Sequence, residues 1–338
     1  MRPLAAAAAS IVLAGAVTSL AQCGSGIDSQ PPHPLTATLW VVGASGHMQV
    51  SRDSGETWLT ADLGTASNLT SISALNSTHA ITGGQNSFVA HTEDGAIWTE
   101  ASVEPSPSAL LNVMLLGAGG VGYALTATNR CSATADGGAT WTATAAIPVA
   151  NVPQAAAFGV DTAHLFVGSF DGSGDTDVGM STSGCSAFSG TALAGTGSGT
   201  VSGIAGFGTS AWLIMSQRAN PPTTDLIFTT TNSGTSWTPQ TSPLGTAQLF
   251  SISARNMSTA WISEGTGRII KTSNGGTNWS TVTVSPSTAI LKVVFVSDLL
   301  GFALDVAEHV FRSVDGGATW KRVQTFSIGS TDLAAVPN

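Results

Sequence analysis

The sequence predicts an all-β fold built from seven repeated units of four antiparallel strands, arranged as a seven-bladed β-propeller. Three observations support this prediction. A short motif ending in an aromatic residue recurs along the chain, and its copies lie 40 to 49 residues apart. Each interval also holds the same order of short apolar runs and polar turns. A period of this length is typical of solenoids and propellers.

The recurring sequence, here called the turn motif, reads Ser-x-Asp-x-Gly-x-Thr-Trp at residues 51–58. Two further copies keep every key position, two replace Asp by Asn, one is looser and one is degenerate. We expect each copy to mark one blade. The seven copies span residues 51–58, 91–98, 134–141, 181–188, 230–237, 272–279 and 313–320.

The chemistry of the turn motif suits a tight connection between two strands. An Asp or Asn oxygen accepts hydrogen bonds from backbone N–H groups ahead of it. Glycine reaches a positive φ without strain, and tryptophan begins the next strand as a large apolar side chain. We therefore interpret these residues as structural and predict no catalytic residue among them. The structural set is Asp53, Trp58, Trp98, Asp136, Trp141, Asn232, Trp237, Asn274, Trp279, Asp315 and Trp320.

The last repeat shows the expected strands a, b, c and d most clearly. Apolar runs at residues 290–296, 301–304, 310–313 and 319–323 are rich in β-branched and aromatic residues, and Gly and Asp separate them. Outside the first 22 residues no segment has a helical stripe longer than two turns. The mature chain is therefore predicted to be all-β.

The two ends of the chain predict how the ring closes. The first repeat starts directly with a strand b at residues 39–43, whereas the second has a strand a at 69–75 before its strand b at 79–82. An additional run at residues 331–336 follows the seventh turn motif. We expect this C-terminal strand to complete the N-terminal blade, which removes open sheet edges.

Residues 1–22 are predicted to be a secretion signal, with one arginine before an Ala-rich run too short to span a membrane. The run ends in Leu-Ala-Gln-Cys, which resembles a bacterial lipobox and implies lipidation of Cys23. The alternative is cleavage after Ala21 and release of a soluble secreted protein. Residues 23–35 are predicted to form a flexible tether, and residues 36–338 the propeller.

The composition favours an exported binding protein over a nucleic-acid or membrane-surface protein. Only 9% of the residues are charged, and the formal net charge is −9. With so few charges, Ser, Thr, Asn and Gly must cover much of the surface. No basic run exists, so nucleic acid and anionic lipid are poor electrostatic partners. We expect a monomer without a cofactor that meets the membrane only through an N-terminal lipid.

The cysteines agree with export. If Cys23 carries a lipid, Cys131 and Cys185 remain as a pair in neighbouring repeats. An oxidising compartment permits a disulfide between them, and two buried free thiols are the alternative.

Two long loops between strands b and c, in the fourth and fifth repeats, are the candidate ligand-binding segments. Three carboxylates in the first, glycine-rich loop could gather around a hard cation such as Ca²⁺. Their spacing differs from that of an EF-hand, so a solvated acidic loop is the favoured interpretation, and no metal is predicted. The candidate ligand-binding residues are Asp171, Asp175, Asp177, Arg218 and Asp225.

A second cluster joins the first and seventh repeats. His47 falls in one b–c loop, and Asp305, Glu308 and His309 fall in the other. Two imidazoles and two carboxylates could bind a transition metal. No short spacing such as His-x-His supports this, so solvated loop residues are the default interpretation.

The turn motif resembles the Asp-box, or BNR, repeat of sialidase-like β-propellers. The resemblance implies that the motif lies between strands c and d, away from the face formed by the b–c and d–a loops, which usually carries ligands. Sialidase activity requires an arginine cluster and a tyrosine nucleophile with a glutamate partner. Arg130, Arg218 and Arg268 fall in b–c loops, but Tyr123 is the only tyrosine and occupies a packing position in strand b. Sialidase activity is therefore not expected.

Within that group the repeats most resemble the photosystem II stability and assembly factor type, whose members are binding scaffolds rather than enzymes. We therefore expect a non-catalytic binding module of the bacterial cell envelope or exterior. Its partner would be a protein or glycan recognised on the b–c/d–a loop face. The alternative is a secreted glycoside hydrolase that uses paired carboxylates on that face.

Overall fold

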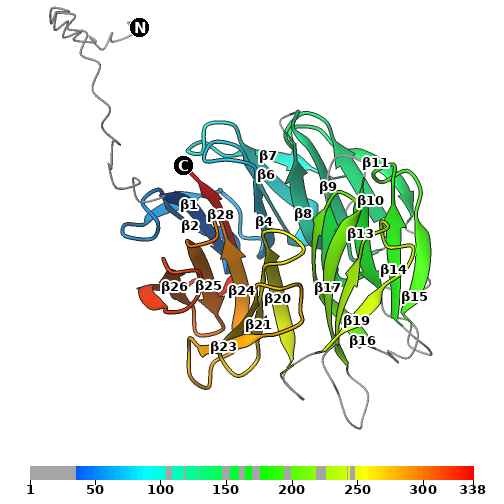
Figure 1. The fold of residues 1–338 in the computed structure, drawn as a ribbon. Helices are drawn as coiled ribbons and strands as arrows, with labels where there is room; N and C mark the ends of the chain where they lie inside the picture. The colour runs from blue at the N-terminus through cyan, green and yellow to red at the C-terminus, as the bar shows by residue number, and fades with distance from the viewer. Residues whose placement is uncertain are drawn as a thin grey trace, which may run out of the picture. The chain divides into compact units, whose positions relative to one another are not determined.

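Seven four-stranded antiparallel sheets make up the protein and form a β-propeller, as predicted (Figure 1). The structure is a computed structural model. It describes residues 36–103, 109–117, 119–128, 130–146, 153–159, 164–169, 176–193, 199–217, 226–241, 243 and 248–338.

Each blade contains strands a to d in order from the propeller axis outward. Blade one contains β28 (Ser330–Pro337), β1 (Ala37–Gly43), β2 (His47–Ser51) and β3 (Leu59–Asp62); blade two contains β4 (Leu69–Ala74), β5 (Ala80–Gly84), β6 (Phe88–Thr92) and β7 (Thr99–Ser102). Blade three contains β8 (Leu110–Leu116), β9 (Val121–Thr126), β10 (Arg130–Thr134) and β11 (Thr142–Ala146); blade four contains β12 (Pro153–Gly159), β13 (Leu165–Ser169), β14 (Thr176–Ser181) and β15 (Ser189–Leu193). Blade five contains β16 (Gly199–Phe207), β17 (Ser210–Gln217), β18 (Leu226–Thr230) and β19 (Thr238–Gln240). Blade six contains β20 (Leu249–Ala254), β21 (Ala260–Glu264), β22 (Arg268–Thr272) and β23 (Ser280–Thr283); blade seven contains β24 (Ile290–Phe295), β25 (Gly301–Asp305), β26 (His309–Ser313) and β27 (Lys321–Thr325).

The C-terminal strand closes the ring, and this prediction is confirmed. Strand β28 pairs antiparallel with β1, and Figure 1 shows the red β28 beside the blue β1. The seven inner strands then contact one another in an unbroken circle, in the order β28, β4, β8, β12, β16, β20, β24 and back to β28. No inner strand is left at an open edge of the ring.

Some strand boundaries differ from the predicted ones. The outer strand of blade seven begins at Lys321 rather than at residue 319, because the backbone N–H of Thr319 still donates to Asp315 in the turn. Two three-residue 3-10 turns, η1 (Ala44–Gly46) and η2 (Gln85–Ser87), join strands b and c in blades one and two. In the part of the chain that the structure describes, no helix is long and apolar enough to cross a membrane.

Buried tryptophans in strand b join blades five and six to the turn motifs of the blades that follow them. Trp212 and Trp261 are fully buried. The turn-motif glycines of the following blades have positive φ, +87° for Gly276 and +89° for Gly317. A Cβ on Gly317 would lie 2.9 Å from the indole nitrogen of Trp261, and one on Gly276 would lie 3.4 Å from the ring of Trp212. The motif therefore needs glycine for its backbone conformation and for the space that the neighbouring indole occupies.

Candidate functional site

The aspartate of a complete turn motif bonds entirely within its own turn. The Asp136 carboxylate accepts from the Thr140 hydroxyl at 2.6 Å and the Thr140 N–H at 2.9 Å, and from the Thr134 hydroxyl at 2.8 Å. The Trp141 indole donates to the Gly138 backbone oxygen at 2.9 Å. The Thr140 bonds stabilise the ionised form and lower the pKa of Asp136 to about 2. Such a carboxylate holds the turn and is unsuited to act as a general acid near neutral pH.

The other copies follow the same scheme to different extents. Asp53 and Asp315 each accept from the N–H and hydroxyl of the Thr four residues later. Asn232 and Asn274 accept the equivalent N–H through the amide oxygen. The turns lie beside the a–b connections, as in blade seven, where the Gly316 N–H donates to Leu299 O at 2.9 Å. The face that carries these turns is here called the turn face, and the opposite face is called the loop face.

The predicted ligand-binding residues in the two long loops lie mostly outside the described residues. Asp171, Asp175, Arg218 and Asp225 belong to segments that the structure does not describe. Asp177 lies in strand β14, paired with Ala192 of β15, and its side chain is outside the described part. Residues 1–35, with the predicted secretion signal and Cys23, are also outside it.

The four side chains considered together in blades one and seven, those of His47, Asp305, Glu308 and His309, do not gather at one site. They make three separate sets of contacts. His309 Nδ1 lies 2.9 Å from the Asp305 carboxylate. Glu308 instead accepts from backbone N–H groups of the connection that leads into β28, and His47 Nδ1 lies 2.7 Å from a backbone oxygen of its own 3-10 turn. Among the described residues no three His, Cys, Asp or Glu side chains are grouped to hold a metal ion.

A buried carboxylate also organises the b–c loop of blade six. The Glu264 side chain accepts from Arg268 Nε at 2.6 Å and from the Thr266 hydroxyl at 2.7 Å. Burial raises the pKa of Glu264, but the bonds from Arg268 and Thr266 outweigh this effect, so the pKa is lowered overall. Arg268 is therefore engaged in its own loop, although its side chain remains 34% exposed.

Cys131 and Cys185 are joined as a disulfide in the structure, with their Cα atoms 5.6 Å apart. Both side chains are buried. Cys131 lies in β10 of blade three, and Cys185 lies in the degenerate turn motif of blade four, which lacks the aspartate. A covalent link therefore connects two blades at the point where the turn motif has lost its own carboxylate.

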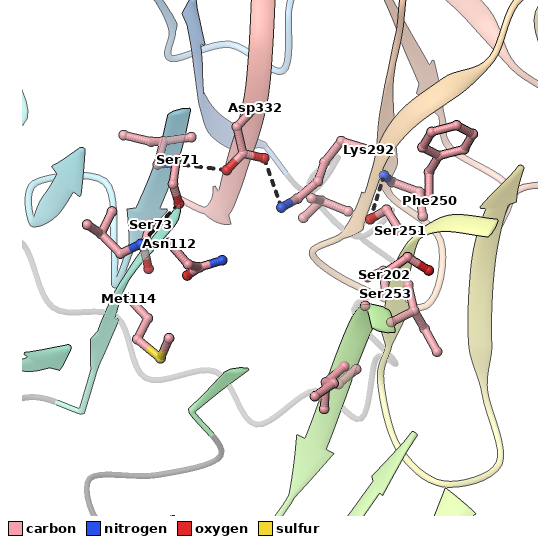
Figure 2. A pocket seen from close by; sticks show the side chains of 18 of the residues that line it. Ser71, Ser73, Asn112, Met114, Ser202, Phe250, Ser251, Ser253, Lys292 and Asp332 are labelled. Atoms are coloured by element: carbon pink, nitrogen blue, oxygen red, sulfur yellow. Dashed lines mark hydrogen bonds and ion pairs between the residues drawn. The ribbon is translucent and has the colours of Figure 1, made fainter. Parts of the chain in front are cut away.

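A cavity of about 580 Å³ lies along the propeller axis and was not predicted from the sequence (Figure 2). Among the described residues, inner strands of six blades line it, namely β4, β8, β16, β20, β24 and β28. Each of these strands carries a β-bulge. The residue that follows the bulge occupies an equivalent place in every blade, here called the post-bulge position. The six post-bulge residues are Ser71, Asn112, Gly203, Ser251, Lys292 and Asp332.

Post-bulge side chains cap the inner edge of the next blade. Ser71 Oγ accepts the backbone N–H of Val113 at 3.2 Å, and Ser251 Oγ accepts that of Val293 at 3.3 Å. Asp332 accepts the N–H of the next blade in the same way, at 3.1 Å. These contacts satisfy backbone donors that have no strand beside them on the axial side. The hydroxyls that line the cavity are therefore partly structural.

Within the described lining of the cavity, one ion pair supplies all the charge. Lys292 Nζ lies 2.8 Å from Asp332 Oδ1, with side chains 34% and 10% exposed respectively. Asp332 also accepts the N–H groups of Ile72 and Leu333. The sequence signal was available, since Lys292 lies in an inner strand at a position where repeats two, three and six have Ser or Asn. Sequence reasoning missed this signal because the β-bulge shifts the register, so the equivalent residues of successive repeats cannot be aligned from the sequence pattern alone.

No family model matches this chain, and no curated protein matches its sequence. Solved structures do match. YCF48 bound to a D1 peptide is 21% identical with a TM-score of 0.64, covering 83% of this chain and 94% of that one. A catalytically inactive virginiamycin B lyase from Staphylococcus aureus with quinupristin is 11% identical, with a TM-score of 0.64 and coverage of 85% and 88%. BamB from Moraxella catarrhalis is 11% identical, with a TM-score of 0.50 and coverage of 86% and 83%. At these identities the likeness is one of fold, and the chain is a β-propeller like these three proteins.

Proposed function

We propose that the protein is a non-catalytic binding module of the bacterial cell envelope or exterior, with turn motifs of the Asp-box kind. It recognises a protein or glycan partner on the loop face, around the mouth of the axial cavity. The observation that supports this most directly is the described lining of the cavity. It offers hydroxyls, one amide and a single carboxylate, Asp332, which already accepts from Lys292 and two backbone N–H groups.

The carboxylate chemistry argues against the glycoside hydrolase alternative. Hydrolysis by paired carboxylates requires two such groups roughly 5–10 Å apart, one of them with a raised pKa. Every pKa shift resolved among the described carboxylates is downward, because hydrogen bonds stabilise the ionised form. These groups are therefore built to hold loops and turns rather than to donate a proton.

The solved propellers favour a protein segment as the first partner class to test. YCF48 was solved with a D1 peptide, so a propeller of related architecture holds a protein segment. A cavity of about 580 Å³ suits a ligand of a few residues or sugar units better than a folded domain. The loop face would supply the remaining contact area.

A lipid on Cys23 is the proposed attachment to the membrane. The Ser54 N–H in the first turn motif donates to Ala37 O at 3.0 Å, so β1 begins at the turn face. Cys23 precedes the described residues in sequence, so its lipidation would occupy no residue of the loop face.

Two exposed valines of blade seven give a matched test. Val306 is 52% exposed in the b–c connection, on the loop face, and Val314 is 65% exposed in the turn motif. The purified protein is screened on peptide and glycan arrays, and the best binder is titrated against both variants. We expect Val306→Arg to weaken binding at least ~10-fold and Val314→Arg to leave binding unchanged. We also expect the wild-type protein not to hydrolyse aryl glycosides. Equal effects of the two variants, or steady turnover of a glycoside, would contradict the proposal.

A further inference from the structure

Lys292 departs from the structural pattern of the axial cavity. Ser71 and Ser251 occupy the same post-bulge position and cap the next blade through an oxygen. An ammonium group has no acceptor and cannot do this. The corresponding N–H of the next blade, that of Leu333, is instead accepted by Asp332 at 2.9 Å. At this position an ion pair replaces the capping bond, because Lys292 of blade seven contacts the Asp332 carboxylate of blade one.

The charge on Asp332 is likewise more than capping requires. Serine hydroxyls of blades two and six accept the equivalent N–H groups of the blades that follow them, so an uncharged acceptor suffices for such a bond. The chain nevertheless places a lysine and an aspartate at adjacent post-bulge positions. Charged groups in a partly desolvated channel are costly unless they are paired and hydrogen-bonded. The ion pair joins blades seven and one, but it leaves the lysine with donor capacity that this contact does not use.

The ammonium group of Lys292 has donor capacity that faces the cavity. It has three N–H groups, and among the described residues one partner, Asp332, is seen. Its side chain is 34% exposed, whereas that of Asp332 is 10% exposed. Figure 2 shows Lys292 from β24 and Asn112 from β8 reaching into the same open space. An amide can donate as well, so the two side chains offer convergent donors.

We propose that the axial cavity binds a ligand bearing a single carboxylate on an otherwise uncharged body. The carboxylate accepts from Lys292 and Asn112, and the body lies against the mixed lining, which includes Met114 and Phe250. Asp332 and the net charge of −9 disfavour ligands with several negative charges. This inference rests on the proposed binding role and specifies its ligand class. The carboxylate can belong to a small free acid or to a side chain of a partner protein.

Two pairs of probes distinguish these sources by isothermal titration calorimetry on the purified protein. The first pair is hexanoate and hexanamide, and the second is the capped tripeptide Ala-Glu-Ala and its match Ala-Gln-Ala. We expect the carboxylate member of at least one pair to bind at least ~10-fold more tightly than its amide, about 1.4 kcal/mol. Binding of hexanoate alone identifies a small acid, and binding of the glutamate peptide identifies a protein segment.

Substitutions then assign the binding to Lys292. Lys292→Ser restores the residue found in blades two and six, so it should fold, and we expect at least a ~10-fold loss of carboxylate affinity. Lys292→Arg should retain most of the affinity, which a purely structural role would not predict. If Lys292→Ser does not fold, Lys292→Gln takes its place. Failure of both carboxylates to bind selectively, or wild-type affinity in Lys292→Ser, would overturn the inference. In either case the comparison of Val306→Arg with Val314→Arg would still report on the loop-face proposal independently.

Discussion

At the scale of single residues, the aspartate of the turn motif shows how a carboxylate is used for structure. Both oxygens of Asp136 accept from Thr140, and a third bond comes from the hydroxyl that precedes the turn. The Asn232 amide oxygen keeps the bonds from the Ser236 N–H and the Thr230 hydroxyl, and its nitrogen donates to the Ser236 hydroxyl. The natural copies thus show that an amide also forms the turn.

The low pKa of Asp136 predicts a pH dependence of stability. Its folded-state value of about 2 lies below the ordinary 3.8, so the unfolded chain binds the proton more readily. The stabilisation is therefore complete above about pH 4 and is lost as the pH falls towards 2. We expect Asp136→Asn to reduce the slope of the free energy of unfolding against pH in this window, and Asp136→Ala to cost about 1–2 kcal/mol at pH 7. Urea unfolding at pH 7, 4 and 2 measures both, and an unchanged slope in Asp136→Asn would refute the assignment.

Adjacent glycines of one turn motif give a second prediction. Both have positive φ, +74° for Gly137 and +102° for Gly138. A Cβ on Gly138 would lie 2.9 Å from Ile81 of the preceding blade, whereas one on Gly137 would meet nothing within 4 Å. We expect Gly137→Ala to cost about 1 kcal/mol and Gly138→Ala about 2–4 kcal/mol, since backbone strain is joined by overpacking. Equal melting temperatures for the two variants would show that the interblade contact is unimportant.

At the scale of elements, one covalent bond reinforces the hydrophobic contact between blades three and four. Cys131 and Cys185 are 54 residues apart in sequence and connect β10 with a turn motif that has lost its aspartate. We expect both thiols to resist alkylation in the denatured protein until a reductant is added. Replacing both by Ala should lower the free energy of unfolding by about 2–4 kcal/mol. Ready alkylation without reductant, or an unaltered stability, would contradict this role.

The strands were largely predictable because their signals are local. The spacing of the turn motifs predicts the number of blades, and the apolar run at residues 331–336 predicts the closing strand. The start of β27 was placed two residues early, because Thr319 has a strand-like side chain yet is held in the turn by Asp315. Local pattern does not reveal a side-chain bond that extends a turn.

The axial cavity was not predictable for a different reason. Its described walls combine strands from six blades, so its chemistry depends on which residues of distant repeats become neighbours. The β-bulge before each post-bulge residue shifts the alternation of inward and outward side chains, so simple period-two reading misassigns Lys292 and Asp332. The predicted ligand residues of the long loops, such as Asp171 and Asp225, stay predictions, because they lie outside the described part.

At the scale of the whole molecule, the predicted lipid anchor precedes the first blade in sequence. Thr36 O accepts the N–H of Asn338 at 2.9 Å, so residue 36 and the C-terminus lie together at blade one. We expect Cys23→Ala to move the protein from the membrane fraction to the soluble fraction of the exporting host. Metabolic labelling with a palmitate analogue gives the control, since wild type should incorporate it. Unchanged fractionation of the variant would reject lipidation and favour the secreted alternative.

Closure of the ring is the claim on which the cavity and both faces depend. Strand β28 is the inner strand of blade one and carries Asp332, which pairs with Lys292. It also lies between β24 and β4 around the axis and contacts both. Removing it would expose the edge of β1 along its whole length and open the cavity to one side.

The most direct test is therefore deletion of residues 331–338, followed by size-exclusion chromatography with light scattering and by thermal unfolding. The closed-ring account predicts that the shortened chain either fails to fold or associates into oligomers that pair the exposed edge of β1. A monomer that unfolds cooperatively at the wild-type melting temperature would contradict it.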